Sequence, residues 1–228
     1  MKVRSLAFSI LVIPGANPLV AWTPRVHEAM TVKAVRMVPR RLSLLLRANP
    51  QVLLEAARGQ ANDQPATAAD VESQFRTILR MSREGITASD LTRELGVLAH
   101  LVQSLNDPSC TTGVTALRDT FETYTDQNLP KWVVTREPFW SLDGPLDPDS
   151  KIEAWAATKA ERTKLLEGFV DPSGRKVGPW DDLSIPFAQV QLSFSNSVHA
   201  TANLWILLYR QTGALWPLPP DPEGSPAS

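Results

Sequence analysis

The sequence predicts an all-α protein, folded as a single-domain multi-helix bundle. Apolar residues recur at intervals of three and four through most of the chain, which is the period of an amphipathic helix. We find no convincing strand pattern and no internal repeat. With 228 residues, 43% of them hydrophobic, the chain is long enough for one domain with a sizeable core.

The first half of the chain contains four helical patterns. Pro39 stops the first pattern, Gly59 opens a polar break that runs to Pro65, and Gly85 ends the fourth pattern. The four helices are predicted at Pro24–Val38, Arg40–Arg47, Pro50–Arg58 and Ala68–Arg83.

A long helix is predicted next, reaching about Leu105. Thr87 or Ser89 can cap it, because Ser and Thr side chains accept hydrogen bonds from the first turn of a helix. His100 and Ser104 lie four residues apart and therefore share one face of this helix. Its buried stripe is predicted to comprise Leu91, Leu95, Leu98, Ala99 and Val102.

The second half predicts three further helices separated by loops. Turn-forming residues are frequent in Phe139–Pro148 and in Asp171–Pro179, so both segments are expected to be irregular. The tail, 216–228, is rich in proline and is expected to be disordered. The helices are predicted at Val114–Asn128, Lys151–Phe169 and Ile185–Thr212.

The first 21 residues have the anatomy of a signal peptide. Lys2 and Arg4 precede an apolar run, and the stretch after that run ends at Ala21, a small residue that suits a signal peptidase. The run is too short to span a bilayer, which needs about 20 residues. We therefore predict cleavage before Trp22, export to the periplasm or the medium, and a helical domain over residues 22–215.

The charge balance argues against highly anionic partners, and the cysteine count rules out an internal disulfide. The 23 Lys and Arg residues nearly balance the 24 Asp and Glu residues, and no basic run is present. This balance argues against duplex DNA or an anionic membrane surface as the main partner. No later segment approaches transmembrane length. Cys110 is the only cysteine, so an internal disulfide cannot form.

Three sequence features together resemble one enzyme superfamily. They are WTPRVH, which contains Trp22 and His27, the segment Leu95–Cys110, and NSVHATANLW near the C-terminus. They are similar to the zinc-dependent phospholipase C and single-strand-specific zinc nuclease superfamily. The resemblance implies an all-helical fold and metal-dependent hydrolysis of phosphodiesters by three zinc ions. It also implies that the amine and carbonyl of Trp22 bind zinc after cleavage, together with His27.

The other ligand motifs of that superfamily are only partly present. Its motif HYxxDxxQPxH corresponds to HLVQSLNDPSC here, in which His100 keeps its place while Ser104 and Cys110 replace an Asp and a His. In a second motif, HxxxE, Arg118 replaces the His and Glu122 matches. The guanidinium of Arg118, one helical turn from Glu122, can replace the charge of a metal ion.

The resemblance therefore implies a reduced metal site. A catalytic zinc ion needs about three protein ligands and an open position for water, so we expect at most one residual zinc ion. No catalytic residue is assigned. His27 and His100 can equally be buried polar residues, and Asp63 lies in a polar segment where Asp is common in turns. The candidate metal ligands are Trp22, His27, Asp63, His100 and Glu122.

Three functions remain open at this point. The first is an exported, degenerate superfamily member whose phosphodiester hydrolysis is weakened or lost; if active, it is a metal-dependent hydrolase. The second is a non-catalytic binding or scaffold protein that keeps the helical cleft. The third is an active hydrolase in which Asp107 and Cys110 replace the missing ligands. The expected partner is a phosphate-containing small molecule or a lipid head group. His199 is expected to be structural.

Overall fold

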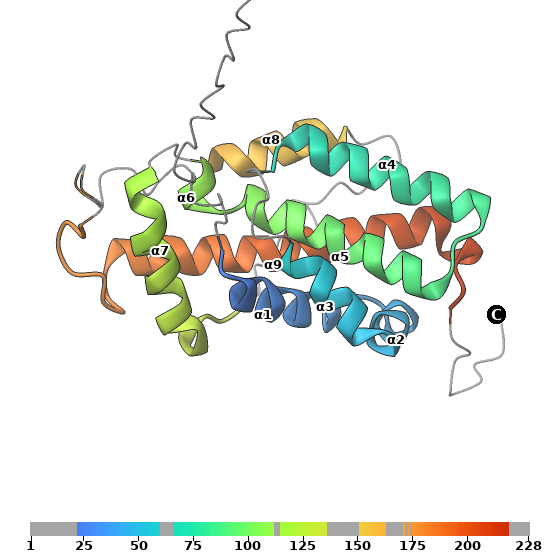
Figure 1. Cartoon of the computed structure of the whole chain (residues 1–228), viewed down its shortest axis with the longest axis horizontal. Coiled ribbons are helices and arrows are strands. Elements are labelled where there is room, and N and C mark those ends of the chain that lie inside the picture. The colour runs from blue at the N-terminus through green and yellow to red at the C-terminus, as the bar shows by residue number, and fades with distance from the viewer. Residues whose placement is uncertain are drawn as a thin grey trace, which may run out of the picture.

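The computed structural model describes residues 22–59, 66–111, 115–135, 151–162, 171, 173 and 175–218, except for the side chains of 110–119, 159, 161 and 162. The fold is all-α, as predicted, and Figure 1 shows its arrangement. Its helices are α1 (Pro24–Val35), α2 (Arg40–Ala48), α3 (Pro50–Arg58), α4 (Ala68–Glu84), α5 (Ala88–Leu105), α6 (Pro108–Thr111), α7 (Thr115–Asn128), α8 (Ile152–Arg162) and α9 (Ile185–Thr212), with the 3₁₀ turns η1 (Leu129–Lys131) and η3 (Gly213–Leu215).

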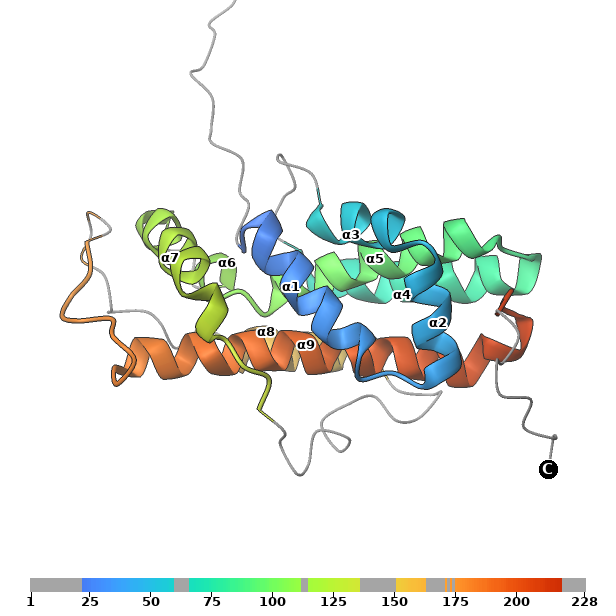
Figure 2. The ribbon, with the colours of Figure 1, turned by 90° about the horizontal axis from the view of Figure 1, so that it is seen from below.

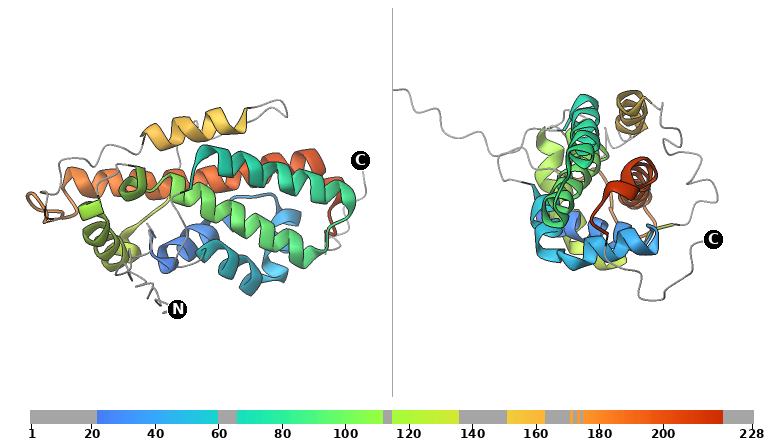
Figure 3. Two further views of the ribbon diagram at one scale, coloured as in Figure 1. Left: turned by 45° about the horizontal axis from the view of Figure 1, so that its top comes forward. Right: turned by 90° about the vertical axis from the view of Figure 1, so that its right-hand side faces the viewer.

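Two long helices form the centre of the molecule. Helix α9 runs along the longest axis. Helix α5 packs against α9, and it also contacts α3 and α4. Helix α1 packs between α9 and α3, and the view from below shows α1, α2 and α3 gathered on one side (Figure 2). Helix α8 lies against α4 on the opposite side (Figure 3). The core therefore lies where α1, α5 and α9 meet.

Side-chain caps explain where several helices begin. Thr67 accepts a hydrogen bond from the backbone N–H of Asp70, whose carboxylate accepts one from the N–H of Thr67 in return, which is the reciprocal capping box. Ser184 caps α9 through a single bond, in which its hydroxyl oxygen accepts the N–H of Phe187. Of the two residues predicted as possible caps of α5, Thr87 is the one that caps it, through the N–H of Asp90.

Buried tryptophans connect the helices in two ways: their rings pack in the core, and their indole N–H groups donate hydrogen bonds to other helices. The indole N–H of Trp205 on α9 donates to the carbonyl of Leu95 on α5 at 3.0 Å, and that of Trp216 donates to the hydroxyl of Ser82 on α4 at 2.9 Å. Each contact buries a large apolar side chain while its single donor stays satisfied, so neither burial carries a desolvation penalty.

Most predicted helix boundaries agree with the structure, and α9 matches its prediction at both ends. Helix α1 ends at Val35, three residues early, because the N–H groups of Arg36 and Met37 turn back to carbonyls three residues before them ahead of Pro39. Helix α6 was not predicted. The loop Phe139–Pro148, the end of the predicted helix Lys151–Phe169, residues 1–21 and residues 219–228 lie outside the described residues. None of the described helices combines the length and apolar character needed to cross a bilayer.

Candidate metal site

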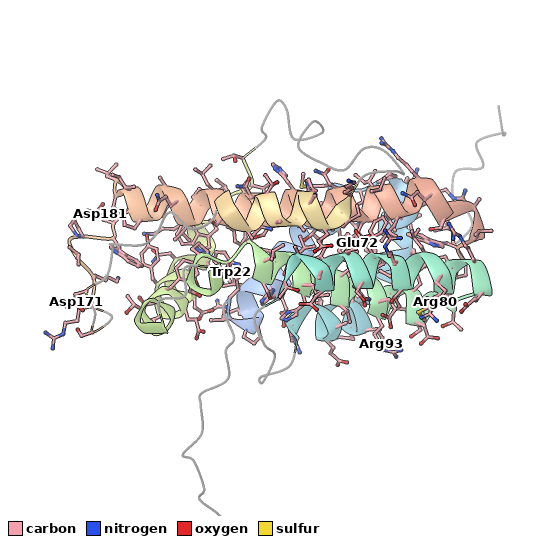
Figure 4. All side chains as sticks on the ribbon, turned by 90° about the horizontal axis from the view of Figure 1, so that it is seen from above. Trp22, Glu72, Arg80, Arg93, Asp171 and Asp181 are labelled. Atoms are coloured by element: carbon pink, nitrogen blue, oxygen red, sulfur yellow. The ribbon has the colours of Figure 1, made fainter. Side chains whose placement is uncertain are left out.

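Two histidines from different helices meet in the core. His27 on α1 is fully buried, His100 on α5 is 8% exposed, and their ring centroids lie 4.7 Å apart. Trp22, at the start of α1, is also fully buried, and its indole N–H donates to the backbone carbonyl of Gln103 at 3.0 Å. Figure 4 shows Trp22 at the end of α1 that faces α7, where its ring packs on Phe121. The sequence-predicted residues Trp22, His27 and His100 are thus brought to one region.

The side chain of Gln103 determines the tautomer of His27. Its amide nitrogen donates to the hydroxyl of Thr31 at 3.0 Å, so its amide oxygen is the atom that faces His27. That oxygen lies 2.7 Å from Nδ1 of His27, which therefore carries the proton and donates. The lone pair is left on Nε2. This pattern, in which the second ring N–H is held by an outer acceptor, is the one that metal-binding histidines use.

The Nε2 atom of His27 is a buried acceptor with no hydrogen-bond partner in the described part of the chain. A buried polar atom in this condition costs free energy and calls for an explanation. Burial first, and the neighbouring His100 second, lower the pKa of His27 to about 3, against the raising effect of its bond to Gln103. The ring is therefore neutral at physiological pH, which is the form that binds a metal ion.

The lowered pKa of His27 predicts a pH-dependent stability for the metal-free protein. Below its ordinary pKa of 6.5 the unfolded chain binds a proton at His27 that the folded chain does not bind until about pH 3. The free energy of unfolding should therefore fall as the pH falls through this window. Urea unfolding at several pH values measures the slope. The variant His27→Gln should show a shallower slope, and equal slopes in the two proteins would contradict the assignment.

The remaining predicted ligands do not join this pair among the described residues. Glu122 is half-buried on α7, and no group of three His, Cys, Asp or Glu side chains placed to hold a metal exists in the described part of the chain. Asp63 lies outside the described residues, as do the side chains of Cys110 and Arg118, so the predicted Arg118–Glu122 pair stays a prediction.

Three other residues considered in the sequence, Ser104, Asp107 and His199, are all buried. Ser104 is buried one turn after His100, where the family motif has a carboxylate. Asp107 is buried, and its Oδ1 accepts hydrogen bonds from the N–H and the hydroxyl of Ser109 at 2.7 and 2.6 Å. That carboxylate oxygen is therefore used to start α6. His199 is buried in α9.

The sequence reading missed the part played by Gln103 and Thr31. Gln103 follows His100 by three residues and shares its side of α5, and Thr31 follows His27 by four on α1. The sequence does contain a signal for this role, because each of the two helices has a polar residue one turn from a candidate ligand. Neither residue was predicted as part of the site, since neither binds zinc well itself.

Comparison with known proteins gives one line of support. No family model matches the chain, and no curated protein matches it. Among solved structures, the chain is similar to the alpha-toxin of Clostridium perfringens from an avian strain, a zinc phospholipase C, with a TM-score of 0.58 at 16% sequence identity. The match covers 89% of this chain and 65% of the toxin chain, so this chain spans less than two thirds of its neighbour. The chain therefore has an all-helical fold distantly related to that of a zinc phospholipase C, and the likeness is one of fold alone.

Proposed function

We propose that this chain is an exported protein of the zinc-dependent phospholipase C and nuclease superfamily that binds one zinc ion and has weak or no phosphodiesterase activity. The observation that carries the proposal is the Nε2 atom of His27, buried and without a hydrogen-bond partner among the described residues while Gln103 holds the opposite ring nitrogen. The likeness of fold to a zinc phospholipase C supports the choice of superfamily.

The residues present fit one zinc ion better than three. His27 offers a neutral imidazole, His100 lies beside it, and the main-chain amine of Trp22 becomes available once the chain is cut before this residue. Nitrogen ligands of this kind suit zinc, and three of them leave a fourth position open. A cluster of several dications needs carboxylates to offset their repulsion, and the carboxylate position of the family motif is Ser104 here.

A bound zinc ion would polarise a phosphoryl oxygen and lower the pKa of a water molecule on its open position. The chain itself supplies the rest of the site. Gln103 orients the ring of His27, which is fully buried, while His100 lies beside it with 8% of its surface exposed. With one ion in place of three, the leaving oxygen is stabilised less. The site should therefore bind a phosphate-containing small molecule or lipid head group but hydrolyse it slowly or not at all.

Zinc content of the cleaved protein tests this proposal. The chain that begins at Trp22 is dialysed against trace zinc, and bound metal is measured by elemental analysis. We expect about one zinc per chain, because the free amine, His27 and His100 together give the three ligands that such an ion needs. A matched control carries one extra Met before Trp22, which removes the free amine from the site, and it should lose most of the zinc.

The outcomes separate the rival functions. One zinc that disappears in the control supports the residual site and justifies assays with phosphodiesters and phospholipids. No zinc in either form refutes the proposal and favours the non-catalytic binding or scaffold protein. Two or more zinc ions in both forms would point instead to rearranged ligands such as Asp107 and Cys110.

A further inference from the structure

A cavity of about 350 Å³ lies between α1, α2 and α3, away from the histidine pair. These three helices are the group that Figure 2 shows on one side of the molecule. Six of the lining residues are apolar and two are arginines: Val32, Val35, Leu46, Pro50, Leu53, Leu54, Arg36 and Arg47. Val32 is 40% exposed and both arginines are exposed, so the cavity reaches solvent beside two cations.

The two arginines have no ion-pair partner within the described residues. The ion pairs there involve other cations, such as Arg58, which pairs with Glu28. No acidic residue lines the cavity. Two guanidinium groups next to an apolar hollow therefore keep their hydrogen-bond donors available for an anion, and guanidinium matches carboxylate and phosphate oxygens in a two-point geometry.

The surrounding segment concentrates positive charge, although the whole chain has a formal charge of −1. Residues 33–58, which form the end of α1 and all of α2 and α3, contain six Lys and Arg residues and one acidic residue, Glu55. Of the six cations, Arg36 and Arg47 line the cavity, while Arg58 is paired with Glu28. Such a local field attracts anions and raises their rate of encounter.

We propose that this cavity binds a single-chain anionic amphiphile, with its alkyl chain among the apolar residues and its carboxylate or phosphate on Arg36 and Arg47. The volume is at the lower end of the range for small-molecule sites, about 300–1,000 Å³. It accommodates one alkyl chain of medium length and excludes the two chains of a membrane phospholipid. The site shares no lining residue with the histidine pair, so it stands or falls independently of the zinc proposal.

Burial of the alkyl chain gives a quantitative expectation. Each methylene transferred from water to an apolar site tightens binding by about fourfold, which is the fold-change equivalent of about 0.8 kcal/mol. Affinity should therefore rise from octanoate to decanoate, and should stop rising once the chain exceeds the cavity. Decanol, which has the chain without the charge, should bind at least tenfold more weakly than decanoate, since it makes no charge-assisted bond to the arginines.

Calorimetric titration of the full chain with octanoate, decanoate, dodecanoate and decanol tests the proposal. Arg36→Ala and Arg47→Ala should each weaken decanoate by about tenfold and bring its affinity toward that of decanol. The matched control is Arg41→Ala, which removes an exposed arginine of α2 that does not line the cavity and should leave affinity within twofold. Val32→Phe should block the cavity, while Val133→Phe, at another exposed valine, should not.

Circular dichroism of each variant shows whether it remains folded, and binding is compared only among folded variants. Saturable binding at one site per chain, lost in Val32→Phe and retained in Val133→Phe, supports the site. The proposal is overturned if decanoate does not bind, or if affinity does not depend on chain length. It is also overturned if Arg36→Ala and Arg41→Ala weaken binding equally, or if the chain binds anionic phospholipid vesicles but not monomeric decanoate, which would indicate a membrane surface instead.

Discussion

Replacing Gly96 by leucine is expected to unfold the protein under conditions in which the native chain is fully folded. Gly96 lies on α5 where α3 crosses it. A Cβ atom at this position would lie 2.6 Å from the carbonyl oxygen of Leu53, 2.7 Å from Cβ of Ala56 and 3.3 Å from the backbone nitrogen of Ala57. Two of these atoms belong to the backbone of α3 and cannot rotate away, so the helices would have to separate.

The expected cost scales with the size of the new side chain. For Gly96→Ala, overpacking costs about 1–3 kcal/mol, from which a gain in helix propensity of about 1 kcal/mol is subtracted. Leucine adds three more carbon atoms at the same crossing and should exceed this range. Thermal unfolding followed by circular dichroism measures both variants against Arg93→Leu, an exposed position on the same helix that should change stability little. A Gly96→Leu protein as stable as the native chain would show that α3 and α5 do not cross as described.

Loss of zinc from variants of His27 and its partner is the second large effect. His27→Gln removes a ligand atom outright and should abolish measurable zinc binding at micromolar metal. Gln103→Leu leaves His27 in place but removes the acceptor that holds its Nδ1–H, so the ring can turn and the tautomer is no longer fixed. Loss of such an outer partner typically weakens metal binding by about 10–100-fold.

Gln103→Glu is the matched rescue variant. Its carboxylate oxygen can still accept the Nδ1–H bond and can also accept one from the hydroxyl of Thr31. Zinc affinity in this variant should stay within tenfold of the native chain. Competition with a fluorescent chelator measures the zinc affinities of the native chain, Gln103→Leu and Gln103→Glu. Equal affinity in Gln103→Leu and the native chain would show that the Gln103 bond plays no part in zinc binding.

The helical architecture was predictable because its signals are local. The boundaries of α9 follow from Ser184 and an apolar pattern that continues for 28 residues, and α3 starts at Pro50, a residue that favours the first helical turn. Helix α6, of four residues, has no such period and was missed. The close crossing at Gly96 depends on the approach of a second backbone, which a single-sequence pattern does not record.

The candidate site was only partly predictable for a similar reason. The spacing of Trp22 and His27 and the position of His100 followed from the resemblance, and the structure places all three in one region. The role of Gln103 depends on its bond to His27, a residue 76 positions earlier in the chain and on another helix, so it required the structure. The cavity beside Arg36 and Arg47 was not predictable from the near-zero net charge of the chain, because the two arginines come to line one hollow only when three helices pack together.

Anomalous X-ray scattering at the zinc edge, from crystals of the chain that begins at Trp22, shows whether the histidine pair binds a zinc ion. We expect one strong peak per chain, about 2.0–2.1 Å from Nε2 of His27 and at the same distance from a ring nitrogen of His100. The Nδ1 atom of His27 should remain bonded to Gln103. No peak at the histidine pair in zinc-soaked crystals, or a peak on Nδ1 with Gln103 displaced, would show that His27 does not bind zinc through Nε2.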